Sequence, residues 1–338
     1  MPAPVVLVSH PACAAHDTGE GHPESPVRLA GILDAVRADG ELAAGPVVEV
    51  GAQPAEPDDL ALAHAPQHVA LVRGMAERAA RRGRVDWVDA DTAVSGASFA
   101  AALAAAGCAI TAAELVATGH AAAALALCRP PGHHAGYDRA AGFCLFNNAV
   151  VAARRLQALG LAERILFVDF DVHHGDGTQS ILWEDPTTAY LSLHLYPHYP
   201  GTGAAWERGG GAASGNVRNV PLAHGTGAGE YRQRFSEALA ASLRVLPPDL
   251  VMMSAGFDCL AGDPLGGLLL EPEDLHAIVA ETVERTRASA AGRVVAVLEG
   301  GYDPARMGQG AANVLRALAG LPASSRLGRI PPARPAHP

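Results

Sequence analysis

The sequence predicts an α/β fold in which a mainly parallel sheet carries helices on both faces. Two observations support this prediction: short apolar runs alternate with longer helical segments through most of the chain, and several of the runs are apolar at every position. The chain has 338 residues and is 49% hydrophobic, which is enough for a large core. We expect one domain over residues 1–322 and a Pro-rich tail over residues 323–338.

The strands are predicted from the short apolar runs. Residues 165–168 read ILFV, as expected for a strand that is buried on both faces. Residues 188–195, TAYLSLHL, form a run of the same type and lead into a loop rich in proline, glycine and tyrosine. In chain order, the predicted strands are 5–8, 46–50, 121–128, 165–168, 188–195, 219–222, 250–254 and 294–298.

The helices are predicted from apolar positions three and four residues apart. In residues 27–36, the side chains of Leu29, Ile32 and Val36 would share one inward face. Residues 58–82 are predicted to be helical in two pieces, with a break near Pro66. Further helices are predicted at 148–159, 230–246 and 271–290.

Two segments raise the question of a membrane span or a metal site. The apolar stretch 97–128 is mostly alanine and is interrupted by Glu114 and His120, so we expect packed helices and a strand here, not a membrane span. His64 and His68 lie four residues apart and could bind a metal ion together. No acidic or cysteine ligand accompanies them, so we expect a surface helix instead.

Composition narrows the class of protein. The five cysteines are scattered without a C-x-x-C pair, which argues against a disulfide framework and favours a reducing compartment, here the cytoplasm. The formal net charge of −10 argues against a general nucleic-acid surface, although it permits a cationic substrate. The start of the chain has no basic leader, and the alanine- and arginine-rich composition points to a bacterial source.

The stretch ILFVDFDVHHGDGTQ, residues 165–179, carries the strongest functional signal. Asp169, Asp171 and His173 occupy alternate positions, so in an extended chain their side chains point to one face. A buried carboxylate is costly unless it is paired or bound to a metal. An isolated Asp-x-His would more often cap the next helix, but His174 and Asp176 follow here, and capping explains them poorly.

Three other predicted strands also end in polar residues. One runs into His133 and His134, one into Asp258, and the last into Tyr302. Taken singly, the histidines could be packing residues in a Pro-Gly turn, and Tyr302 a half-buried loop tyrosine. Because ligands of such sheets bind at the carboxyl ends of the strands, four such exits together favour a single site.

These residue types suit metal-assisted amide hydrolysis. Asp171, His173 and Asp258 would bind a catalytic zinc through three protein ligands and leave one position open. A general base is available from His133 or His134, and Tyr302 could donate to a developing oxyanion. Carboxylates that accept the other ring N–H of the histidines would orient them, and the candidates are Asp169 and Asp176.

Six motifs in order resemble the signatures of the histone deacetylase superfamily: RPPGHHA, GFCLFNN, DFDVHHGDGTQ, SLH followed by YPGTG, SAGFDCLAGDPLGG, and LEGGYDP. They span residues 129–304, and HDTGEGHPESPVRL nearer the start adds to the match. The closing motifs are more similar to class II deacetylases and bacterial deacetylase-like amidohydrolases than to class I. The resemblance implies an arginase-like fold and zinc-dependent removal of an acyl group from a lysine side chain.

The resemblance also implies roles for the matching residues. His134 would be the general base of the tandem pair His133–His134, and Tyr302 would polarise the carbonyl. One zinc ion per chain is implied, and a structural potassium ion would be bound by Asp169, Asp171, His173, Ser192 and Leu193. The tunnel for the lysine stem would be lined by Gly142, Phe143 and Tyr199, with Leu265 at its mouth and Asp91 clamping the substrate backbone.

Two residues depart from the pattern of the family. Tyr199 stands where phenylalanine is common, and Asp176 stands where many class II members have asparagine. Leu265 replaces the acidic residue that polyamine-selective relatives carry, which favours an acyl-lysine protein or peptide as the substrate.

Three alternatives stay open at this stage. The chain could hydrolyse acetylpolyamines or other small acetylated amines, or it could be a non-enzymatic zinc-containing module that binds acyl ligands. It could also be an arginase-type enzyme with two manganese ions. We predict no nucleic-acid or membrane partner, and the sequence does not indicate the oligomeric state.

Overall fold

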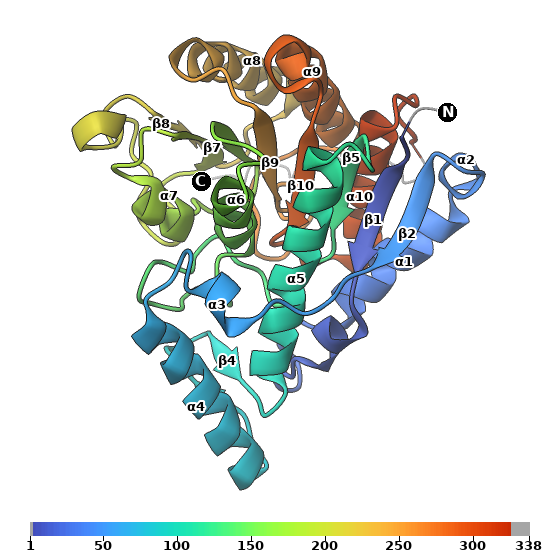
Figure 1. The fold of residues 1–338 in the computed structure, drawn as a ribbon. Helices are drawn as coiled ribbons and strands as arrows, with labels where there is room; N and C mark the ends of the chain where they lie inside the picture. Colours follow the sequence, from blue (N-terminus) through green and yellow to red (C-terminus); the bar gives the residue numbers. More distant parts are fainter. Residues whose placement is uncertain (1–2, 326–338) are drawn as a thin grey trace, which may run out of the picture.

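The computed structural model describes residues 3–325 and places them around one eight-stranded sheet (Figure 1). Every neighbouring pair of strands in this sheet is parallel, which confirms the predicted α/β class. The strand order is β2-β1-β5-β10-β9-β6-β7-β8. The strands are β1 (Val5–Ser9), β2 (Val47–Gly51), β5 (Ala123–Ala126), β6 (Ile165–Asp169), β7 (Thr188–Leu195), β8 (Val217–Leu222), β9 (Leu250–Ala255) and β10 (Val294–Leu298).

Two layers of helices cover the sheet. One layer runs as a chain of contacts from α1 through α10 and α9 to α8, and the other contains α5 and α6, which pass in front of the sheet in Figure 1. The helices are α1 (Val27–Ala38), α2 (Gly40–Ala43), α3 (Pro57–Leu60), α4 (Pro66–Arg82), α5 (Ser98–Ala117), α6 (Asn148–Ala158), α7 (Asp176–Leu182), α8 (Ala228–Val245), α9 (Pro272–Ala290) and α10 (Pro304–Leu318). A short hairpin, β3 (Asp86–Trp87) and β4 (Ala93–Val94), lies beside α4.

The four strands that were predicted to end in functional residues are neighbours at the centre of the sheet. They are β5, β10, β9 and β6, in that spatial order. All eight strands run parallel, so the carboxyl ends of these four meet at one edge. The register places Asp169 opposite Ser254, and Ser254 opposite Val297, so the loops that follow start at the same height.

The core explains why the strand predictions succeeded. The side chains of β6, β7, β9 and β10 are buried along their whole length, which matches their predominantly apolar sequences. Among the described residues, only α5 is apolar and long enough to cross a membrane by composition, and 67% of that window is buried within the protein.

Helix α10 was not predicted, and the reason is its glycines. Gly308 and Gly310 lower the intrinsic helix propensity of the segment. Yet a Cβ atom on Gly308 would lie 2.5 Å from the Gly31 carbonyl oxygen of α1, and one on Gly31 would lie 2.6 Å from the Pro304 oxygen. Contacts between the two helices therefore require these glycines, and tertiary packing offsets the weak local preference. Helix α7 and the β3–β4 hairpin were also not predicted.

The expectation of a surface helix at His64 and His68 is wrong. Both side chains are buried, and His64 lies before α4, not within it. The His64 ring bonds to the Gly136 carbonyl at 2.8 Å and accepts the Asn147 N–H at 2.8 Å, while His68 bonds to the Leu145 carbonyl at 2.9 Å. The pair therefore holds loop backbone in the interior. The predicted tail lies outside the described residues from residue 326 onward, and the domain boundary at 322 stays a prediction.

Gly107 of α5 provides a test of close packing. A Cβ atom at this position would lie 2.0 Å from the Gln53 carbonyl oxygen, so Gly107→Ala forces the backbone apart. We expect a loss of about 1–3 kcal/mol in the free energy of unfolding, measured by urea denaturation. Gly74→Ala in α4 is the matched control, because its Cβ would approach only a flexible Arg78 side chain at 3.7 Å. Equal stability of the two variants would contradict the packing argument.

Candidate functional site

Three predicted metal ligands converge at the carboxyl edge of the sheet. One ligand atom from each of Asp171, His173 and Asp258 lies within 4.8 Å of the others. The His173 Nδ1 atom lies 3.0 Å from Asp171 Oδ1 and 3.2 Å from Asp258 Oδ2. Asp171 and Asp258 are fully buried, and His173 is nearly so. The structure therefore brings two carboxylates and one imidazole to a single point.

The surroundings of these ligands fit a bound cation. Asp258 Oδ2 is buried and accepts no hydrogen bond among the described residues. Burial and the negative charge of Asp171 raise the pKa of Asp258. The surrounding protein groups therefore do not fully offset the negative charge of these two carboxylates. Burial also opposes ionisation of Asp171, but His133 and His173 lower its pKa below the usual value. Two carboxylate oxygens and one imidazole nitrogen are a donor set that suits catalytic zinc.

Backbone groups from neighbouring strands fix the two carboxylates. Asp171 Oδ2 accepts the Gly300 N–H at 2.8 Å, and Asp258 Oδ1 accepts the Val172 N–H at 3.0 Å. A Cβ atom on Gly256 would lie 2.0 Å from Asp171 Oδ2, and one on Gly300 would lie 2.1 Å from Asp258 Oδ2. Glycine is therefore required at both strand exits, a role that the sequence analysis did not assign.

The tandem histidines pair with the two acids that were predicted to orient them. His133 Nδ1 lies 3.1 Å from Asp169 Oδ2, and His134 Nδ1 lies 2.8 Å from Asp176 Oδ1. Asp169 Oδ2 also accepts the Tyr190 hydroxyl at 2.9 Å. Each imidazole therefore has one nitrogen held by a carboxylate, which orients the ring.

The pKa values of the two histidines are shifted in opposite directions. Burial lowers the pKa of His134 to about 3, and the neighbouring His133 adds to this effect against the attraction of Asp176. Burial also opposes protonation of His133, but Asp171 and Asp169 raise its pKa well above the ordinary value. Protonation is therefore favoured at His133 and disfavoured at His134, whose Nε2 atom could accept a proton when Nδ1 carries the ring hydrogen.

Glu299 supports the histidine loop and was missed by the sequence analysis. Its Oε2 atom accepts the backbone N–H groups of Gly132 at 2.6 Å and His133 at 3.0 Å. Its Oε1 atom lies 3.2 Å from the Ser254 hydroxyl, and burial raises its pKa to about 7. The sequence contains a signal for this residue, because Glu299 directly follows the last strand and precedes two glycines.

A pocket of about 360 Å³ opens onto this centre. Its lining contains every residue predicted for the substrate tunnel, together with His134, His173 and Tyr302. The full lining is Asp91, His134, Gly142, Phe143, His173, His198, Tyr199, Pro264, Leu265, Gly266 and Tyr302. The sequence analysis missed His198, whose ring stacks on that of His173 at a centroid distance of 5.1 Å.

Tyr302 is fixed by one carboxylate and one cation. Its backbone N–H donates to Asp263 Oδ2 at 2.7 Å, and Asp263 Oδ1 accepts the Leu265 N–H at 2.9 Å. The Arg28 guanidinium lies 5.1 Å from the centroid of the Tyr302 ring. Burial and the charge of Asp258 raise the pKa of Tyr302 well above 10, so the hydroxyl keeps its proton. Asp263 therefore joins the loop that carries Leu265 to the loop that carries Tyr302.

The five residues predicted to bind potassium lie together on β6, β7 and the loop after β6. Asp169 is the register partner of Ser192, and all five side chains are largely buried. The Ser192 hydroxyl lies 2.8 Å from His194 Nδ1. Potassium binding stays a prediction.

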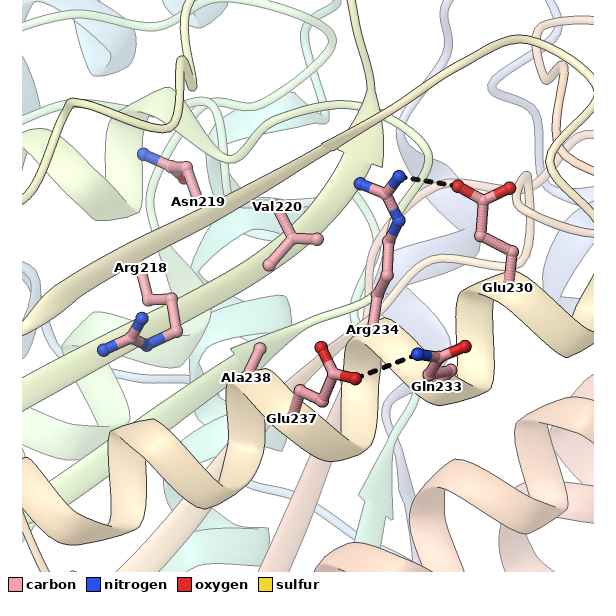
Figure 2. A pocket seen from close by; sticks show the side chains of 8 residues that line it. All are labelled: Arg218, Asn219, Val220, Glu230, Gln233, Arg234, Glu237 and Ala238. Carbon is pink, nitrogen blue, oxygen red and sulfur yellow. Dashed lines mark hydrogen bonds and ion pairs between the residues drawn. The ribbon is translucent and has the colours of Figure 1, made fainter.

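A larger hollow, of about 570 Å³, lies between β8 and α8 (Figure 2). Glu230 pairs with Arg234 there, and Glu237 accepts a hydrogen bond from Gln233. No member of the metal-ligand set or of the histidine pair faces this hollow. It is the larger space, but it does not contain the groups that amide chemistry needs.

Comparisons with known proteins agree with this geometry. A family model described as "Histone deacetylase domain" matches residues 22–318. "Histone deacetylase 10, chloroplastic" of Oryza sativa subsp. japonica is 34% identical over 314 residues, which cover 90% of this chain and 71% of the rice protein. The chain spans about half the length of several other plant relatives.

A bacterial relative and a solved structure extend the comparison. "Acetylpolyamine amidohydrolase" of Mycoplana ramosa is 38% identical over 236 residues, which cover 68% of this chain and 66% of that protein. The crystal structure of the HDA15 HD domain superimposes with a TM-score of 0.84 at 34% identity, covering 95% of this chain and 90% of that one. The structural match confirms the predicted deacetylase-like fold.

Substitution of one metal ligand tests the metal assignment. Asp258→Asn removes a charged oxygen donor, and we expect zinc affinity to fall by more than about 100-fold, because even outer-shell substitutions cost 10–100-fold. The measurement is zinc content after dialysis against a competing chelator of known affinity. Asp58→Asn, at an exposed acid of α3, serves as the control and should retain full occupancy. Equal zinc retention by the two variants would refute the assignment.

Proposed function

The chain belongs to the histone deacetylase family, and on that premise we propose that it is a zinc-dependent amidohydrolase that removes an acetyl or other acyl group from lysine side chains of proteins or peptides. One observation carries the proposal: His173 of the metal-ligand set, His134 of the tandem histidines and Tyr302 all line one pocket of about 360 Å³. If these residues had only a structural role, no pocket connecting them to solvent would be needed.

Asp171, His173 and Asp258 would hold the zinc ion. When bound there, zinc lowers the pKa of a water molecule and polarises a carbonyl oxygen. The glycines at 256 and 300 leave space for the carboxylates, and the Asp258 Oδ2 atom, which accepts no hydrogen bond among the described residues, supplies an available ligand atom. The proposed potassium site is formed by Asp169, Asp171, His173, Ser192 and Leu193.

His134 is the proposed general base. Its neutral imidazole can take a proton from the attacking water at Nε2 while Asp176 holds Nδ1. The same nitrogen can then return the proton to the departing amine. The His133 ring lies with its centroid 4.1 Å from that of His134, and its raised pKa favours an imidazolium that would stabilise negative charge as it develops in the reaction.

Tyr302 is the proposed oxyanion donor. Because its hydroxyl stays protonated, it can donate a hydrogen bond to the carbonyl oxygen as that oxygen becomes negatively charged. The Asp263 carboxylate fixes the backbone of Tyr302 and Arg28 lies over its ring, so the donor is preorganised.

The lining of the pocket supports an acylated side chain with an apolar stem as the substrate. Phe143 and Tyr199 supply aromatic faces for a methylene stem, and the Asp91 carboxylate at the mouth would accept backbone N–H groups of a peptide. Leu265 supplies no negative charge to bind a distal ammonium group. The amidohydrolase of Mycoplana ramosa makes acetylated polyamines a second candidate class. We propose a cytoplasmic location.

The direct test compares two substrates with and without a chelator. We expect the zinc-loaded protein to release acetate from an acetyl-lysine peptide faster than from N-acetylputrescine, and the chelator to abolish both reactions until zinc is restored. Acetate release is measured by a coupled enzymatic assay. Preference for N-acetylputrescine would favour the second class, whereas no turnover of either, or chelator-resistant turnover, would refute the proposal.

Tyr302→Phe separates the chemical step from metal binding. Loss of one oxyanion donor should lower kcat by about 100-fold or more, with unchanged zinc content. Tyr137→Phe, at an exposed tyrosine, is the control and should keep full activity. If Tyr302→Phe kept wild-type kcat, the proposed role of the hydroxyl would be wrong.

A further inference from the structure

We propose that Thr92 is a positioning residue whose hydroxyl holds the Asp91 carboxylate and the Phe143 backbone together as one unit at the mouth of the pocket. This inference rests on the proposed function, because it concerns which part of an acylated substrate the unit recognises. It follows from the hydrogen bonds of a single buried side chain.

The Thr92 hydroxyl uses both its donor and an acceptor lone pair. It donates to Asp91 Oδ1 at 3.1 Å and accepts the backbone N–H of Phe143 at 3.2 Å. Thr92 is completely buried, whereas both of its partners line the pocket. Residues 51 positions apart in the sequence are thus joined by one oxygen atom behind the pocket wall.

The Phe143 end of this link lies in an unfavourable backbone conformation. Ala141 and Cys144 form an antiparallel bridge, so Gly142 and Phe143 are the two central residues of a tight turn. Their φ angles are +53° and +68°, the signs that a type I′ turn requires. Glycine adopts positive φ readily, but phenylalanine rarely does, so the turn needs support from outside itself.

The turn is pressed against catalytic groups. A Cβ atom on Gly142 would lie 2.5 Å from the His134 ring and 3.0 Å from the Tyr199 hydroxyl. The Phe143 ring also packs edge-on against that of Tyr302 at a centroid distance of 5.9 Å. A shift of this turn would therefore change the width of the pocket beside the proposed base.

The Asp91 end of the link is held by backbone hydrogen bonds. Asp89 Oδ1 accepts the N–H groups of Asp91 at 3.1 Å and Thr92 at 2.8 Å. The Thr92 carbonyl accepts the Val88 N–H at 2.8 Å within the β3–β4 hairpin. The backbone of Thr92 is thus fixed independently of its side chain, so removal of the hydroxyl should loosen Asp91 and Phe143 and leave the hairpin intact.

This arrangement predicts different effects on two classes of substrate. A peptide would engage both members of the unit: its backbone meets Asp91, and its lysine stem meets Phe143. A small acetylated amine has no peptide backbone and would engage Phe143 alone. Loss of the Thr92 hydroxyl should therefore weaken peptide recognition more than recognition of a small amine.

The test compares Thr92→Val, which keeps the shape but removes the hydroxyl, with Thr92→Ser, which keeps the hydroxyl. We expect Thr92→Val to raise KM for an acetyl-lysine peptide by about tenfold, as for loss of a hydrogen bond to a charged group, and KM for N-acetylputrescine by less than about threefold. Thr92→Ser should stay within about twofold of wild type for both substrates. Thr286→Val is the matched control, because that buried hydroxyl bonds to carbonyl groups of its own helix α9, those of Thr282 and Val283.

A second measurement does not depend on activity. In Thr92→Val, the Phe143 amide should exchange its hydrogen at least about tenfold faster than in wild type, while amides of β6 keep their protection. In Thr92→Ser and Thr286→Val, exchange at Phe143 should not change. This readout separates the inference from the proposed function, which would fail on its own if the wild-type protein hydrolysed neither substrate.

Three outcomes would overturn the inference. The first is unchanged exchange at Phe143 in Thr92→Val. The second is an equal rise in KM for the two substrates, which indicates general loosening of the site. The third is a Thr92→Ser variant as impaired as Thr92→Val, which shows that volume matters and the hydroxyl does not.

Discussion

Buried negative charge at the carboxyl end of the central strands is the constraint on which the rest of the structure depends. Asp169, Asp171, Asp258 and Glu299 are all fully buried within one short stretch of the sheet edge. Charges in such a place must be paired, neutralised or bound to a cation. Backbone N–H groups and two histidines satisfy most of the carboxylate oxygens, but Asp258 Oδ2 accepts no hydrogen bond among the described residues and has the His173 ring 3.2 Å away. A cation bound there would offset this buried negative charge.

The same buried acids shift the pKa values of the tandem histidines. His133 lies close to Asp169 and Asp171, and their charges outweigh the cost of burying an imidazolium. His134 lies one residue farther along, next to that positive charge, and pairs only with Asp176. The pKa values of two adjacent residues of one type are therefore shifted in opposite directions by position alone. This division of roles supports a neutral base beside a cationic partner.

The walls of the pocket are held from behind by residues that do not reach the substrate. Glu299 holds the loop of His133, and Asp263 joins the loops of Leu265 and Tyr302. Thr92 joins Asp91 to the turn at Gly142 and Phe143. Each of these side chains accepts a backbone N–H group of a loop other than its own. Glu299 and Thr92 bond to the loop after β5, and Asp263 bonds to the loop after β10. Loops have little stability of their own, so such links provide the rigidity that a catalytic site requires.

The sequence by itself determined the strand order along the chain, the alternation with helices, and the residues that meet at the centre, such as Asp171, His173 and Asp258. It could do so because buried strands are apolar throughout and alternate positions share one face. Only the tertiary structure decided that His64 is buried, that α10 forms despite its glycines, and that Glu299 and Thr92 support the site. The physical reason is that these properties depend on contacts with residues far away in the sequence. The local pattern of apolar and polar residues does not indicate such contacts.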